Sequence, residues 1–168
     1  MDMLDIRPLD RQHGLGAFSC GEDRIDNYLR LNAWKEQKSH RMRVFAATIK
    51  GELTVVGYYS LTFIVWNEEV VETERAKSKL TRSGAATPAI YLAKLGVTDD
   101  HKRQGIGEAL VRDAFIRSIA IANNAAISTL TLDAISEAKA KWYEKLGFER
   151  FAPDDLKMVI SLATLRKT

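Results

Sequence analysis

The chain has 168 residues, of which 46% are hydrophobic and 28% are charged, a composition typical of one globular domain with a substantial core. We find no apolar run long enough to cross a bilayer, and the short acidic start is unlike a signal or transit peptide. The single cysteine, Cys20, excludes an intramolecular disulfide and a cysteine-rich zinc site, so we expect a protein of the reducing cytoplasm. The three histidines share no metal-ligand spacing, and no metal site is predicted.

The net charge of +3 is unevenly distributed. Residues 24–43 hold six cations and two carboxylates, a net of +4, and residues 75–82 form a second basic cluster. Solvated faces are the simpler explanation, and a groove for a polyanionic substrate is the alternative. The candidate polyanion-binding residues are Arg24, Arg30, Lys35, Lys38 and Arg41 in the first cluster, and Arg75, Lys77, Lys79 and Arg82 in the second.

The first half of the chain predicts a strand, a helix and a hairpin. Residues 4–9 are typical of a strand, and residues 22–39 have helical spacing. Strand-like runs at 43–49 and 53–66 flank a turn at 50–52, and Gly57 indicates a bulge or a close backbone approach. The inner stripe predicted for the helix is Ile25, Tyr28, Leu29, Leu31 and Trp34.

The second half predicts alternating strands and helices after a polar surface excursion at 67–87, which includes a helical turn at 72–80. The strands are expected at 89–97, 129–134, 148–151 and 156–162, and the helices at 105–123 and 136–146. Ser136 can cap the second of these helices, and Gly147 can end it at a C′ position. This order of elements predicts one mixed α/β domain with a central sheet, covering residues 1–168.

The segment Lys102-Arg103-Gln104-Gly105-Ile106-Gly107 joins the strand at 89–97 to the long helix. Two glycines at a helix N-terminus allow close backbone approach, and the free N–H groups there favour an anion such as a pyrophosphate. A Walker loop would need a Gly-Lys-Ser/Thr ending, and a dinucleotide fingerprint would need a third glycine where Leu110 stands. A tight connection without a ligand remains the structural alternative.

A second candidate is Tyr143, which lies four residues before Gly147-Phe148 in the helix at 136–146. Its hydroxyl could donate a proton to a leaving group. The alternative is a core tyrosine whose hydroxyl reaches the surface.

Together these segments resemble the GCN5-related N-acetyltransferase (GNAT) superfamily. The family's cofactor motif is Gln/Arg-x-x-Gly-x-Gly/Ala, which matches residues 102–107 with Lys102 at the first position, and its later Tyr-x-x-x-Gly-Phe pattern matches residues 143–148. The resemblance implies a central mixed, mostly antiparallel sheet of six to seven strands, splayed between strands 4 and 5, with helices on both faces.

The resemblance also implies the cofactor and its site. Acetyl-CoA would pair through its pantetheine with the strand edge Leu95-Gly96-Val97, and its acetyl carbonyl would be polarised by a backbone N–H near Leu95. Tyr143 would protonate the departing CoA thiolate. The residues implied for the pyrophosphate are Lys102, Arg103, Gln104, Gly105, Ile106 and Gly107.

A narrower resemblance covers the whole chain. Residues 18–21, 25–29, 43–45, 56–61 and 93–97 resemble the acetyltransferase toxins of bacterial toxin–antitoxin pairs, which acetylate the amino group of aminoacyl-tRNA and block translation. This implies a tRNA-binding role for the basic clusters, a homodimer, and a ribbon–helix–helix antitoxin. An N-acetyltransferase for a small or protein amine and a non-catalytic acyl-CoA sensor are the alternatives. Cys20 is expected to pack, not to react.

Overall fold

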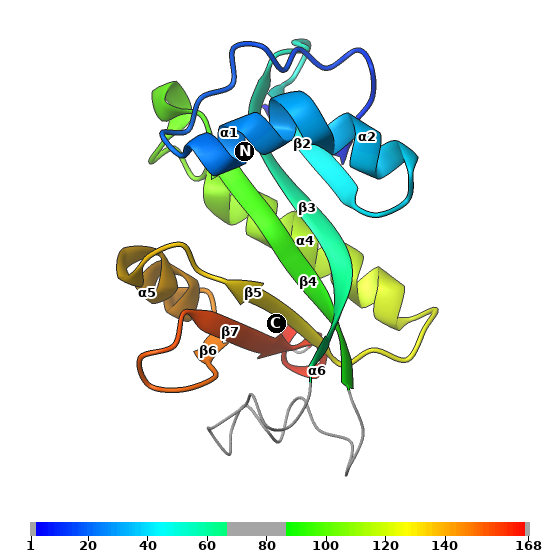
Figure 1. The fold of residues 1–168 in the computed structure, drawn as a ribbon, viewed down its shortest axis with the longest axis vertical. Coiled ribbons are helices and arrows are strands. Elements are labelled where there is room, and N and C mark those ends of the chain that lie inside the picture. Colours follow the sequence, from blue (N-terminus) through cyan, green and yellow to red (C-terminus); the bar gives the residue numbers. More distant parts are fainter. Residues whose placement is uncertain (1–2, 67–86, 167–168) are drawn as a thin grey trace. The chain divides into compact units, whose positions relative to one another are not determined.

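The computed structural model describes residues 3–66 and 87–166, in which seven strands are ordered β1-β2-β3-β4-β5-β7-β6 (Figure 1). The strands β4 and β5 are parallel, whereas β1–β2, β2–β3, β5–β7 and β6–β7 are antiparallel. The mixed α/β class and the mostly antiparallel sheet are therefore confirmed. The strands are β1 (Leu4–Pro8), β2 (Arg43–Ile49), β3 (Val55–Trp66), β4 (Thr87–Val97), β5 (Thr129–Asp133), β6 (Glu149–Arg150) and β7 (Lys157–Ser161).

The helices confirm the predicted positions and add short elements that the sequence did not indicate. They are α1 (Asp23–Asn27), the π-helical η1 (Tyr28–Asn32), α2 (Ala33–Lys38), the 3-10 turn η3 (Asp99–His101), α4 (Ile106–Ala122), α5 (Glu137–Lys145) and α6 (Leu162–Leu165). The chain divides into two compact units, Met1–Thr62 with Ala93–Ala114, and Phe63–Leu92 with Phe115–Thr168. The predicted excursion at 67–87 and its helical turn lie almost entirely outside the described residues.

The predicted helix at 22–39 is interrupted by a π turn. The N–H of Ala33 donates to the carbonyl of Tyr28, five residues earlier, so η1 holds one residue more than an α-helical turn. The extra residue shifts the inner face. Leu31 was predicted to point inward but is 72% exposed, and Ala33 is fully buried instead.

Two glycines let helices pack closely on both faces of the sheet in the first unit. A Cβ on Gly57 would lie 3.1 Å from side-chain atoms of Ile106 and Leu110 in α4, and one on Gly96 would lie 2.7 Å from Ile25 Cγ2 in α1. Close approach at Gly57 is thus confirmed, and the β2–β3 register leaves Val56 as the bulged residue next to it. Figure 1 shows α1 and α4 on opposite sides of these strands.

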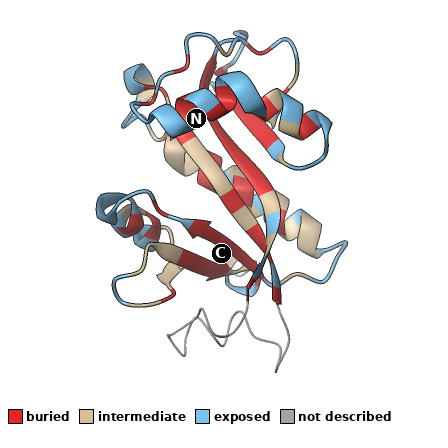
Figure 2. Ribbon diagram, in the orientation of Figure 1, coloured by how far each residue is buried: buried red, intermediate tan, exposed pale blue. Residues whose placement is uncertain are grey.

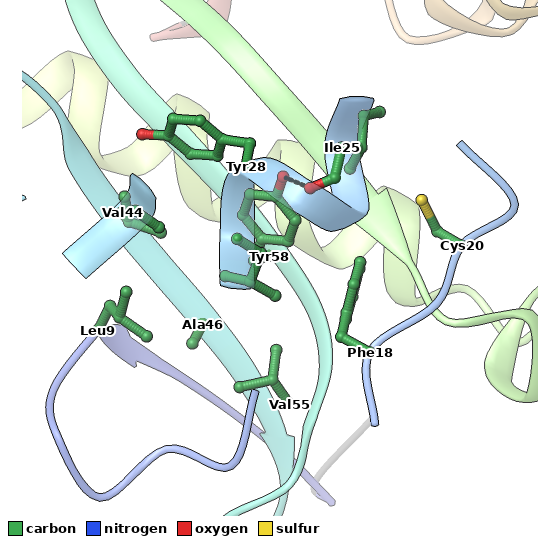
Figure 3. Packing of buried hydrophobic residues seen from close by; sticks show 11 residues of the cluster. Leu9, Phe18, Cys20, Ile25, Tyr28, Val44, Ala46, Val55 and Tyr58 are labelled. Atoms are coloured by element: carbon green, nitrogen blue, oxygen red, sulfur yellow. Dashed lines mark hydrogen bonds between the residues drawn. The ribbon is translucent and has the colours of Figure 1, made fainter. Parts of the chain in front are cut away.

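The core of the first unit gathers on the α1 side of β2 and β3. Tyr58 is fully buried and donates its hydroxyl to the carbonyl of Ile25 at 2.7 Å, and the Phe18 ring packs edge-on against it (Figure 3). The interior of β2, from Val44 to Thr48, is buried without interruption (Figure 2). This packing anchors α1 and the loop before it to β2 and β3.

The second unit holds its own core and confirms the caps of α5. Trp66, Ala89, Phe151 and Val159 form a buried cluster. Ser136 accepts a hydrogen bond from the N–H of Lys139, and Gly147 follows the helix with φ +96°, the left-handed conformation that ends a helix. Among the described residues, no helix is long and apolar enough to span a bilayer.

Candidate functional site

The predicted pyrophosphate segment forms a sharply bent loop between η3 and α4. Two of its residues are left-handed, Gly105 with φ +80° and Arg103 with φ +61°. Glycine adopts this conformation freely, whereas it is uncommon and strained for arginine. Arg103 therefore keeps a backbone shape that a glycine would favour, and the bend brings the loop into the first turn of a 17-residue helix.

The N–H groups of this segment are available to a ligand. The first turn of a helix leaves its N–H groups without intrahelical partners, and the helix dipole is positive there. In the described parts of the chain, the N–H groups of residues 103–107 donate to no backbone carbonyl outside the helix. The loop and helix start thus fit a pyrophosphate, as the sequence predicts.

Lys102 does not contribute a free charge or N–H group to this segment. Its ammonium lies 2.5 Å from the Asp99 carboxylate and donates to the carbonyl of Cys20 at 2.7 Å. Its backbone N–H donates to the Asp99 carbonyl at 3.3 Å. Lys102 ties the loop to the segment before α1, so the N–H groups open to a ligand begin at Arg103.

The predicted pantetheine edge lies beyond the paired part of β4. The β4–β5 register runs only from Ile90↔Leu130 to Leu92↔Leu132, so Leu95-Gly96-Val97 follows the paired segment. Pairing that stops within β4 agrees with the predicted splay of the two strands. On the face towards α1, Gly96 is covered by Ile25. The backbone of this stretch fits a ligand that binds as an extended chain.

Tyr143 lies in α5, in the second unit, and its side chain is buried. Its ring packs edge-on against Trp142 and Phe148, with centroids 4.8 and 5.5 Å away. In the part of the chain that the structure describes, the Tyr143 hydroxyl forms no hydrogen bond. Burial raises the pKa of Tyr143, which keeps the phenol protonated at neutral pH.

The predicted basic residues are exposed where the structure describes them, on α1, η1, α2 and the turn after it. Arg30 is partly committed, because its guanidinium donates to the Phe18 carbonyl and the Asn27 side chain, both at 3.2 Å. The other exposed members of this cluster are Arg24, Lys35, Lys38 and Arg41. Arg75, Lys77, Lys79 and Arg82 lie outside the described residues.

Cys20 is a packing residue, as predicted. It is buried in the core of the first unit, and its N–H donates to the Asp26 carboxylate at 2.9 Å. Burial and the Asp26 hydrogen bond raise the pKa of Cys20 to about 12, so the thiol is protonated and unreactive at neutral pH. Across residues 3–66 and 87–166, we find no group of three or more potential metal-ligating side chains.

One polar cluster was not predicted from the sequence. The ammonium of Lys94, on β4, lies 5.4 Å from the centre of the Tyr28 ring. The Tyr28 hydroxyl donates to Glu36 at 3.0 Å. The three residues lie 8 to 66 positions apart, and only the fold brings them together, so no local sequence pattern could have indicated them.

Comparison with known proteins finds similar sequences over most of the chain. The acetyltransferase (GNAT) domain model matches residues 43–150. The "Probable toxin TacT" of Sinorhizobium fredii is 26% identical over 172 residues, covering 96% of this chain and 92% of the relative. The "tRNA-acetylating toxin" of Mycobacterium tuberculosis is 25% identical over 150 residues, covering 89% and 87%.

Solved structures of the toxin AtaT have the same fold. AtaT complexed with acetyl-methionyl-tRNAfMet superposes with a TM-score of 0.86 at 20% identity, covering 98% of both chains. A tyrosine-to-phenylalanine variant of AtaT, bound to acetyl-CoA and the C-terminus of the antitoxin AtaR, superposes with a TM-score of 0.83 at 20% identity, covering 99% of this chain and 98% of AtaT.

Proposed function

The chain belongs to the GNAT acetyltransferase family, and from this we propose that it is a toxin that acetylates the amino group of aminoacyl-tRNA and thereby blocks translation. The observation that carries the proposal is the similarity along nearly the whole chain to a toxin named TacT, together with similarity to a tRNA-acetylating toxin. Both relatives match the N-terminal half as well as the family domain, and that half carries the first basic cluster.

Acetyl-CoA is the acetyl donor in this proposal. The N–H groups of residues 103–107 would hold its pyrophosphate, and the backbone of Leu95-Gly96-Val97 would pair with its pantetheine. When bound, the cofactor supplies an acetyl group activated as a thioester. The N–H near Leu95 would donate a hydrogen bond to the carbonyl oxygen and stabilise the negative charge that develops on it.

Tyr143 is the proposed general acid. The amine nitrogen forms a bond to the acetyl carbon, the carbon–sulfur bond breaks, and the thiolate takes the proton from Tyr143 Oη. The nitrogen releases its own proton to solvent, from which Tyr143 is reprotonated. Burial raises the pKa of Tyr143, so the phenol carries its proton before the reaction begins. The α-amine of an aminoacyl ester is less basic than a lysine amine, so no strong protein base is required.

The partners follow from the same proposal. Exposed cations on α1, η1 and α2 would contact tRNA phosphates. We take residues 1–168 as one acetyltransferase domain that acts in the cytoplasm as a homodimer. AtaT is bound by an antitoxin, AtaR. We propose that this chain also has an antitoxin, of the ribbon–helix–helix type.

Acetyl transfer to purified charged tRNA tests the proposal. The enzyme, acetyl-CoA labelled in the acetyl group and a panel of aminoacyl-tRNAs should give labelled N-acetylaminoacyl-tRNA. Uncharged tRNA, polyamines and lysine peptides serve as controls. Transfer to these amines but to no charged tRNA would assign the chain to small-amine or protein acetylation. Acetyl-CoA binding without transfer to any acceptor would assign it as a sensor.

A further inference from the structure

Lys94 is a half-buried cation in the middle of β4 that no predicted role includes. It lies two residues before Gly96 and therefore on the same face of the strand, the face towards α1. At Gly96 this face is sealed by Ile25. At Lys94 the ring of Tyr28 lies against the ammonium, which also donates a long hydrogen bond of 3.4 Å to the Ala93 carbonyl. In the described part of the chain, this half-buried ammonium thus uses one of its three N–H donors, and the others can bind a further acceptor.

The charges around Lys94 favour a bound anion. Burial lowers the pKa of Lys94, and the nearby positive charge of Arg24 lowers it further, while Glu36 opposes both effects. The Glu36 carboxylate already accepts the Tyr28 hydroxyl. Two cations close enough to repel each other, beside one carboxylate that is already hydrogen-bonded, leave a local excess of positive charge that an anion would relieve.

The fold supports this arrangement with an irregular helix. Tyr28 is the first residue of the π turn, and such turns are rare and frequent at functional sites.

We propose that Lys94, held over Tyr28, binds the phosphodiester that precedes the terminal adenosine of the charged tRNA. Lys94 immediately precedes Leu95, whose N–H would polarise the reacting carbonyl in the proposed function. This phosphodiester is the phosphate of an aminoacyl-tRNA nearest to its amino group. Lys94 would therefore select acceptors that carry a phosphate over free amines. The inference rests on the proposed function and names a recognition contact within it.

Two acceptors that differ in this phosphodiester test the proposal. Puromycin carries a free α-amine on an aminoacyl adenosine without a phosphodiester, and cytidylyl-puromycin adds the phosphodiester. The wild-type enzyme should show a lower KM for cytidylyl-puromycin. Lys94→Gln should raise that KM roughly tenfold or more, with kcat, the KM for puromycin and the KM for acetyl-CoA nearly unchanged. Lys94→Arg should retain most of the preference, and Lys50→Gln, in the exposed β2–β3 turn, is the charge-matched control.

Intact charged tRNA gives an independent readout. In Lys94→Gln, the slope of log(kcat/KM) against log salt concentration should become shallower by about 0.7, the value for one phosphate contact on a single strand. Equal losses on both puromycin acceptors, or an unchanged slope, would overturn the role of Lys94 alone. A raised KM for acetyl-CoA would assign the anion to the cofactor and overturn it as well. Failure of the wild type on every charged tRNA would overturn the proposed function, and this inference with it.

Discussion

At the scale of single residues, Tyr143 combines a buried ring with a hydroxyl that has no partner in the described chain. We expect Tyr143→Phe to retain acetyl-CoA binding and to lose turnover by roughly 10²–10⁴-fold, the usual contribution of a general acid. Calorimetry measures the first and single-turnover kinetics the second. Tyr91→Phe is the matched control, because the Tyr91 hydroxyl is held by Asp133 at 2.6 Å in the same unit. Unchanged turnover in Tyr143→Phe would remove Tyr143 from its role.

Gly107 tests the pyrophosphate segment. Asp in the first turn of a helix is favourable for the helix itself, so Gly107→Asp should fold normally. Its carboxylate would repel the pyrophosphate, and we expect acetyl-CoA binding to weaken by about 2 kcal/mol or more, roughly thirtyfold. Gly107→Asn has nearly the same shape without the charge and should lose less. Calorimetry showing wild-type affinity in Gly107→Asp would contradict the location of the site.

At the scale of secondary-structure elements, the contact between α1 and β4 depends on the absence of a side chain at residue 96. A Cβ there would lie 2.7 Å from Ile25 Cγ2, so Gly96→Ala should destabilise the fold by about 1–3 kcal/mol. Gly16→Ala is the control, because a Cβ on Gly16 meets nothing within 4 Å and should change stability by less than about 0.5 kcal/mol. Chemical denaturation measures the free energy of unfolding of both variants. Equal values would show that α1 can shift away from β4 at little cost.

Most elements could be predicted because their signals are local. The hydrophobic pattern placed β2 exactly and α4 to within one residue at each end, and Ser136 and Gly147 marked the ends of α5. The π turn could not be predicted, because no residue type specifies it, and the wrong placement of Leu31 followed from this. The salt bridge between Lys102 and Asp99 was not predicted, because it depends on the 3-10 turn η3, which the sequence did not indicate.

The residues of the candidate site were predictable to different degrees. The free N–H groups of residues 103–107 could be predicted, because the two glycines at the start of a helix are visible in the sequence itself. Lys94 was not singled out, because its environment depends on Tyr28 and Glu36, which come from another part of the chain. Side-chain clusters assembled across a fold leave no spacing pattern, so they become visible only in three dimensions.

At the scale of the whole molecule, the net charge of +3 is small. We therefore expect the first basic cluster, in residues 24–43, to provide most of the electrostatic attraction for tRNA. Lys35 is exposed on α2. We expect Lys35→Glu to raise the KM for charged tRNA roughly tenfold at low salt without changing the KM for acetyl-CoA. Lys50→Glu, the same charge change in the β2–β3 turn, should have a much smaller effect. If the two variants raised the KM for charged tRNA equally, the first basic cluster would act only through the net charge of the protein, and not as a binding site.

The central claim is that the acetyl group is transferred to the amino group of aminoacyl-tRNA, and mass analysis of tRNA ends tests it most directly. The chain and its Tyr143→Phe variant are expressed separately in a bacterium, and the terminal aminoacyl-adenosines are released from total tRNA by nuclease. The account predicts a mass increase of one acetyl group on at least one aminoacyl-adenosine in cells with the wild-type chain, and its absence with Tyr143→Phe. Growth arrest with every aminoacyl end unmodified would contradict it.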